Sequence, residues 1–157
     1  MTCILQIDSA LSEASVSLSR NGTLIGSRQH HAPMDHAAFI QTGIRDLLLE
    51  TQTKGSDISA VAVVSGPGSY TGIRVAMASA KGLAYAWKKP LITLNSLELM
   101  AQAAIRELRP SSPSYWIPMI DARRLEVFTA CYDQDGKEIK VLFTQSVFCC
   151  CRRRAKA

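Results

Sequence analysis

Apolar and polar residues follow one another along the chain in a way that predicts strands and helices in a definite order. Residues 14–19 alternate apolar and polar side chains, which is typical of a strand with one buried face. Residues 60–65 form a β-branched run without charge, as a parallel strand buried on both faces does. Further strands are expected at residues 3–7, 23–28 and 91–94, and helices at residues 35–53, 71–87 and 95–108. Strands followed by alternating helices and strands predict an α/β fold.

Short polar signals mark where these elements begin and end. Asn21-Gly22 tolerates positive φ at both positions and predicts a tight hairpin between the second and third strands. Gly55 is expected to stop the first helix. Asn95, with Glu98 three residues later, has the pattern of a helix N-cap.

Residues 66–74 read Gly-Pro-Gly-Ser-Tyr-Thr-Gly-Ile-Arg and join the apolar 60–65 strand to the next helix. Pro67 fixes φ, the flanking glycines permit a sharp turn, and Ser69 or Thr71 is placed to cap the helix. Free backbone N–H groups at such a corner can hold a phosphate or a carboxylate, although a turn that binds nothing is an equally open interpretation. The candidate anion-binding residues are Gly66, Gly68, Ser69 and Thr71.

The helix expected at residues 71–87 carries small residues at strict four-residue spacing: Gly72, Ala76, Ala80 and Ala84. Positions four apart share one helix face, so this stripe lets another backbone approach closely. Packing inside this chain and a contact between subunits are both open from the spacing. We predict a partner-binding surface made of the stripe, its neighbours and the preceding helix: Ile44, Leu47, Leu48, Gly72, Ile73, Ala76, Met77, Ala80 and Ala84.

Residues that could carry catalysis are few, and none is assigned a catalytic role. Asp8 ends the first strand, but Ser-Ala-Leu follows it where a phosphate-binding loop would need glycine, so Asp8 is expected to accept hydrogen bonds from the next turn. His30, His31 and His36 lack the i, i+4 spacing that directs two imidazoles at one metal ion. No metal site and no cofactor bound by this chain are therefore expected.

The opening pattern returns in the second half of the chain, after a Pro- and Ser-rich linker at residues 109–114. Ile7-Asp8 is followed by a strand and a turn at Asn21-Gly22, and Ile120-Asp121 is followed by a strand and a turn at Asp135-Gly136. This repeat predicts two related lobes, with the second one built from strands at residues 115–120, 125–131 and 139–143. The expected organisation is a first lobe at residues 1–108, the linker, a partial second lobe without helices at residues 115–146, and a tail at residues 147–157.

Composition and charge agree with a domain located in the cytoplasm. Of 157 residues, 47% are hydrophobic, which supplies at least one sizeable core, and no apolar stretch is long enough to span a bilayer. Arg152, Arg153, Arg154 and Lys156 account for four of the five net positive charges. The remaining sequence has no evident basic stripe or aromatic stacking platform, so sequence-specific nucleic-acid binding is not expected.

Several separated blocks together resemble the TsaB (YeaZ) family, the accessory subunit of tRNA threonylcarbamoyladenosine biosynthesis. The blocks are residues 5–9, 66–74, 80–84, 90–97 and 120–128. The resemblance implies an actin-like ATPase fold (ASKHA, ribonuclease H-like) with a complete first lobe and an incomplete second lobe. It stops near residue 143, and family members continue beyond this length. The basic, cysteine-rich residues 147–157 are therefore interpreted as a non-family tail at a truncated or frame-shifted end.

The resemblance also implies a function. It predicts a noncatalytic scaffold that binds and supports the transferase TsaD, with the ATPase TsaE joining the pair and a nucleotide near the subunit junction. A homodimer is expected in isolation. The alternative is a stand-alone enzyme, either an actin-like kinase or a glycoprotease-like metallopeptidase. The missing glycine loop and the unpaired histidines argue against it.

Overall fold

The computed structural model describes the backbone of residues 1–31 and 36–146 and the side chains of residues 1–31 and 38–140. The described residues fall into two compact units, one ending at Leu94 and one beginning at Asn95. The expected tail at residues 147–157 lies outside the described residues. Within the described part, no helix combines the length and the apolarity that crossing a lipid bilayer requires.

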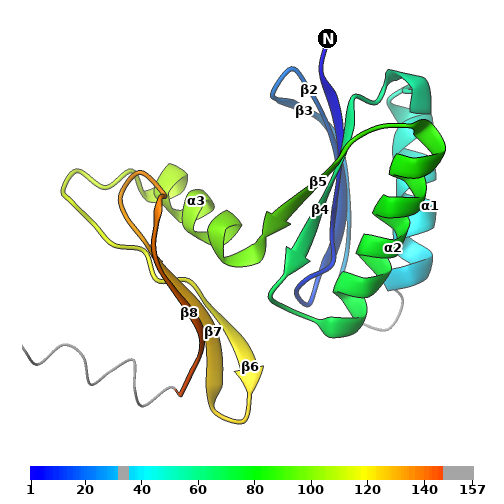
Figure 1. The fold of residues 1–157 in the computed structure, drawn as a ribbon. Coiled ribbons are helices and arrows are strands. Elements are labelled where there is room, and N and C mark those ends of the chain that lie inside the picture. The colour runs from blue at the N-terminus through cyan, green and yellow to red at the C-terminus, as the bar shows by residue number, and fades with distance from the viewer. Residues whose placement is uncertain (32–35, 147–157) are drawn as a thin grey trace, which may run out of the picture. The chain divides into compact units, whose positions relative to one another are not determined.

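The first unit is a five-stranded sheet with two helices on one face (Figure 1). Its elements are β1 (Cys3–Asp8), β2 (Ala14–Arg20), β3 (Thr23–His30), α1 (His36–Glu50), the 3-10 helix η2 (Gly55–Asp57), β4 (Ala60–Gly66), α2 (Tyr70–Trp87) and β5 (Leu91–Asn95). The strand order is β3-β2-β1-β4-β5, with β1 antiparallel to β2 and parallel to β4. Helix α1 packs on β2 and β3, and α2 packs on β1 and β4.

The core of this unit lies between the sheet and the two helices. Successive strand side chains point to opposite faces, so alternate residues of β1 and β2 face the helices. Each Leu, Ile or Val buried there contributes about 1.5–3 kcal/mol of transfer free energy. The buried residues include Leu5, Ile7, Val16, Leu18, Ile40, Leu47, Val61, Val63, Ala76 and Ala80. The opposite face of β1 and β2 is polar, because Gln6 donates to Ser19 and accepts from Ser17.

Most local predictions for this unit are confirmed. Asn21 and Gly22 form the hairpin turn with φ of 50° and 81°, and β4 is buried along nearly its whole length. Helix α1, however, ends three residues earlier than residue 53. Gln52 adopts a φ of 50°, and the Thr53 N–H donates to the Leu48 carbonyl at 2.9 Å, which closes the helix end.

The second unit pairs one helix with a three-stranded antiparallel sheet. Its elements are α3 (Ser96–Leu108), β6 (Met119–Arg123), β7 (Glu126–Tyr132) and β8 (Glu138–Ser146). The Asn95 side chain accepts from the N–H groups of Leu97 and Glu98, which confirms the expected helix start. Three consecutive antiparallel strands occur here as in β1, β2 and β3, in agreement with the internal repeat.

The boundary between the units differs from the expected one at residue 108. Helix α3 belongs to the second unit, because Leu97 and Ala101 pack against Ile120, Ala130 and Tyr132. The sheet expected to lack helices therefore has one covered face. Burial, with smaller contributions from the charges of Glu138 and Glu98, raises the pKa of Tyr132 to about 12.

The first strand of this sheet begins later than residue 115. Trp116 makes an isolated bridge with Tyr132, and the regular strand β6 starts only at Met119. Pro118 explains the interruption, because proline has no N–H to donate to a strand ladder. The expected linker at residues 109–114 lies between α3 and β6.

Candidate functional site

The turn between β4 and α2 brings the predicted corner residues together. Gly66 has a φ of 108°, a conformation that favours glycine, and a cis peptide bond joins it to Pro67. Ser69 is the N-cap of α2, since its Oγ accepts from the Gly72 N–H at 3.3 Å. The capping role proposed for Ser69 is therefore confirmed.

The corner is held against the turn that follows β1. The Ser69 N–H donates to the Ala10 carbonyl at 2.6 Å, and the buried Ser9 hydroxyl donates to the Gly72 carbonyl at 2.7 Å. A Cβ at Gly68 would collide with the Ala10 carbonyl oxygen, and one at Gly72 with the Ser9 carbonyl oxygen. The two glycines thus permit a close approach of two backbone segments.

The hydrogen bonds within this corner engage polar groups that an anion would otherwise bind. Of the four candidate anion-binding residues, Ser69 has both its N–H and its hydroxyl oxygen engaged within the chain. Gly66, Gly68 and Thr71 lie in the same turn or in the first turn of α2. The geometry assigns the corner a structural role, and anion binding stays a prediction.

Asp8 lies beside this corner and accepts from the Ala10 N–H at 2.9 Å, as expected from the sequence. Burial raises its pKa, and the hydrogen bond from Ala10 partly opposes this effect. Asp121 repeats the arrangement in the second unit, because it accepts from the Arg123 N–H at 2.7 Å. Both aspartates therefore hold the turn that follows the first strand of their sheets.

The small-residue stripe of α2 faces its own sheet. Gly72, Ala76, Ala80 and Ala84 are all buried, and Ala80 is 0% exposed. The interpretation of this stripe as a partner-binding surface is therefore wrong: it lets α2 pack closely on β4 and β1.

The neighbouring residues of the predicted surface are also turned inward. Ile44 and Leu47 of α1 are buried in the same core. Leu48, Ile73 and Met77 are half-buried, and Leu48 and Met77 pack against that core. These residues therefore belong to the hydrophobic core of the first unit or lie at its edge. None of them is exposed.

A second row of small residues lies on the outside of α2. Ala78, Gly82 and Ala86 are exposed at the same four-residue spacing, and a Cβ at Gly82 would meet nothing. Spacing alone could not separate this row from the buried one, because small residues occupy every second position from 76 to 86. The polar neighbour Lys81 was the signal in the sequence that this side faces outward.

Outward-facing side chains on both helices complete this surface. Leu49 of α1 is 70% exposed, and Tyr70 and Tyr85 of α2 are 73% and 88% exposed. We call the following set the helical outer face: Gln41, Thr42, Arg45, Leu49, Tyr70, Arg74, Ala78, Lys81, Gly82, Tyr85 and Ala86. Exposed tyrosine and arginine are enriched at surfaces that bind other proteins.

The histidines are engaged in separate contacts. His30 stacks on Phe39 with ring centroids 5.1 Å apart, and His31 Nδ1 lies 3.0 Å from Glu13 Oε1. The His36 side chain is outside the described residues. Among the described residues, no group of three or more His, Cys, Asp or Glu is arranged to hold a metal ion.

Comparisons with known proteins place this architecture in a family. A family model described as TsaD, tRNA N6-adenosine threonylcarbamoyltransferase, matches residues 28–153. The tRNA threonylcarbamoyladenosine biosynthesis protein TsaB of Escherichia coli K12 is 36% identical over 87% of this chain. The protein of the same name from Bacillus subtilis is 32% identical over 82% of it. The chain spans 57% and 54% of the lengths of these two relatives.

A solved structure of YeaZ from Pseudomonas aeruginosa superposes with a TM-score of 0.79 and 32% identity, over 92% of this chain and 67% of that one. At the level of the fold alone, component A of (R)-2-hydroxyglutaryl-CoA dehydratase from Acidaminococcus fermentans has a TM-score of 0.52 at 13% identity, over 94% of this chain and 48% of that one. The expected actin-like, ribonuclease H-like fold class is confirmed. By sequence and by structure, this chain belongs to the TsaB (YeaZ) family.

Proposed function

We propose that this chain is a noncatalytic subunit in tRNA threonylcarbamoyladenosine biosynthesis, where it binds and supports the TsaD transferase. The names of the related TsaB proteins support the pathway. Since the chain spans little more than half of those relatives, the proposal concerns what the two units present here can do. Its role is to position or stabilise TsaD, which transfers the threonylcarbamoyl group to adenosine.

The observation that carries this proposal is the helical outer face. Its exposed small residues allow a helix of a partner to approach at the lower end of the ~8–10 Å interaxial range. Leu49 and Tyr85 are exposed on the helices of the first unit, and the Tyr85 ring supplies a large contact area. The proposed contact involves the same two helices as the sequence prediction. It lies on the exposed side of α2, opposite the buried stripe.

The remaining partners belong to the same proposal. TsaE joins the complex, a nucleotide sits near the junction of the subunits, and the isolated chain forms a homodimer in the cytoplasm. Each of these expectations comes from the family resemblance. Each can be checked by sizing the purified chain alone and with the two proteins.

The experiment measures association with TsaD by titration calorimetry or pull-down and compares two matched variants. Ala78→Arg places a long cation in the middle of the helical outer face, and Ala103→Arg makes the same change at an exposed position of α3. We expect Ala78→Arg to weaken TsaD binding at least about tenfold while Ala103→Arg leaves it unchanged. Equal binding by both variants would move the interface away from α2.

A second measurement tests the noncatalytic role. The chain is added to TsaD, TsaE, threonylcarbamoyl-adenylate and tRNA, and modified adenosine is counted with and without it. We expect modification to depend on the chain, and we expect the chain alone to turn over no ATP. ATP hydrolysis, or about one metal ion bound per purified chain, would instead support the kinase or metallopeptidase alternative.

A further inference from the structure

One side of α2 combines exposed cations with exposed aromatic rings. Tyr70, Arg74, Lys81 and Tyr85 are all exposed and recur at intervals of four, seven and four residues, which places them on one helix face. We call these four residues the basic row. Helix α2 contains no Asp or Glu along its whole length.

The cations of the basic row have no acidic partner in the part of the chain that the structure describes. The ion pairs found there are Arg28–Glu50, His31–Glu13 and Arg45–Asp46. Arg74 instead lies 5.2 Å from the centroid of the Tyr70 ring and donates to its hydroxyl at 3.1 Å. This contact holds the guanidinium on the helix surface while its charge stays uncompensated.

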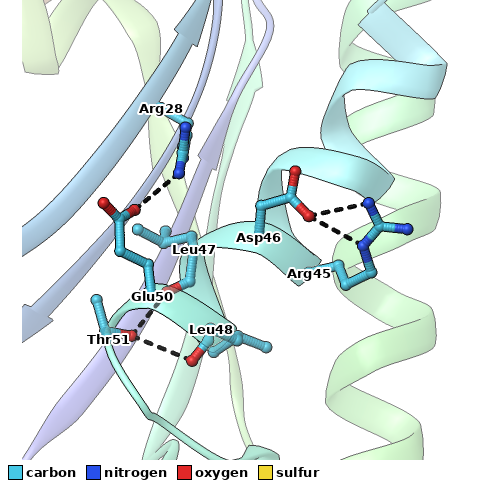
Figure 2. Close-up of polar contacts among 7 residues, drawn as sticks. All are labelled: Arg28, Arg45, Asp46, Leu47, Leu48, Glu50 and Thr51. Carbon is cyan, nitrogen blue, oxygen red and sulfur yellow. Dashed lines mark hydrogen bonds and ion pairs between the residues drawn. The ribbon is translucent and has the colours of Figure 1, made fainter.

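The acidic side chains of the neighbouring helix α1 already form ion pairs within this chain. Figure 2 shows Asp46 accepting from Nε and Nη2 of Arg45, and Glu50 accepting from Arg28. The distances lie between 2.8 and 3.0 Å. Both carboxylates of α1 already have a cation beside them, so they attract Arg74 or Lys81 of another molecule less strongly than unpaired carboxylates would.

We propose that the basic row favours an acidic surface on TsaD over a second copy of this chain; the proposal rests on the function proposed above. In a symmetric dimer whose two-fold axis passes close to the basic row, the rows of the two copies lie near each other and their like charges repel. An acidic partner surface gains attraction at the same place. The charges thereby favour the heterologous pair over the homodimer.

Salt concentration distinguishes TsaD binding from self-association. Salt screens the attraction that would hold TsaD, and it also screens the repulsion that would keep two copies of this chain apart. Between about 0.05 and 0.5 M salt, TsaD affinity is expected to fall, whereas self-association of this chain through α2 is expected to strengthen. The measurement is titration calorimetry for the heterologous pair and sedimentation for the isolated chain. Opposite signs for the two salt dependences are the expected result.

Removing the charges provides the matched test. Arg74→Gln with Lys81→Gln should weaken TsaD binding at least about tenfold at low salt, and it should strengthen self-association because the repulsion between two basic rows is lost. Arg106→Gln with Lys137→Gln removes two exposed cations of the second unit and should do neither. Circular dichroism confirms that all variants are folded.

Each outcome decides between the proposals. Salt-independent TsaD binding that tolerates the Arg74/Lys81 double variant overturns the role of the basic row and leaves the scaffold function standing. Absence of TsaD binding to the wild-type chain at any salt concentration overturns both. If the double variant loses tRNA binding but keeps TsaD, the row serves an RNA backbone and the inference is wrong.

Discussion

Two glycines of this chain should respond in opposite ways to substitution by alanine. Gly68 lies where a Cβ would collide with a backbone carbonyl, whereas Gly82 is in the middle of an exposed helix with open space around it. Gly68→Ala should lower the free energy of unfolding by about 1–3 kcal/mol, because backbone must shift. Gly82→Ala should raise it by about 0.5–1 kcal/mol, because alanine loses less entropy in a helix. Urea unfolding measures both, and equal effects would contradict the placement of α2.

Asp8 makes the stability of the first unit depend on pH. Its pKa is raised by burial from the ordinary value of 3.8, so the folded state binds the proton more tightly than the unfolded state. Stability from this group is therefore present below the unfolded pKa and is lost as the pH rises through the folded pKa.

Asp8→Asn tests this effect, because it removes the charge and keeps an oxygen that accepts from the Ala10 N–H. We expect the variant to be more stable than the wild type at pH 7, with a difference that shrinks as the pH falls to about 3.8. Thermal melts over this pH range measure it. A difference that is constant with pH would show that burial does not control this carboxylate.

At the scale of the element, α2 presents two stripes of small residues with different roles. Ala80→Arg should unfold the first unit, costing more than about 4 kcal/mol, because an unpaired charge and a long side chain would enter a closed core. Ala78→Arg, on the exposed stripe, should change stability by no more than about 0.5 kcal/mol. Chemical denaturation compares the two. If Ala80→Arg stays folded and loses only partner binding, the buried stripe would be the interface after all.

At the scale of the whole molecule, the chain divides before α3. A protein ending at residue 95 keeps all five strands and both helices of the first unit, whereas one ending at residue 108 retains α3 without its sheet. We expect the shorter protein to unfold cooperatively and to bind little anilinonaphthalene sulfonate. The longer one should bind more dye, because Leu97 and Ala101 lose the residues that bury them. Equal dye binding by the two proteins would place α3 in the first unit.

The sequence by itself determined the features that depend on neighbouring residues. Ser69 and Asn95 cap helices as predicted, and Asn21-Gly22 turns its hairpin, because each needs only local hydrogen bonds or local φ. The order of elements and the repeated three strands follow in the same way from periodicity. The family blocks then indicated the fold class, which the comparisons confirm.

The tertiary structure alone decided which surfaces are free. Helix α2 has small residues at every second position, so its sequence allows close packing on either side, and the sheet beneath Ala76 and Ala80 settled which side is buried. The sequence likewise predicts α3 without stating which sheet covers its apolar side. The candidate binding site was therefore predicted to the correct helices and to the wrong face of α2. Burial depends on contacts between residues far apart in the chain, which a one-dimensional pattern does not contain.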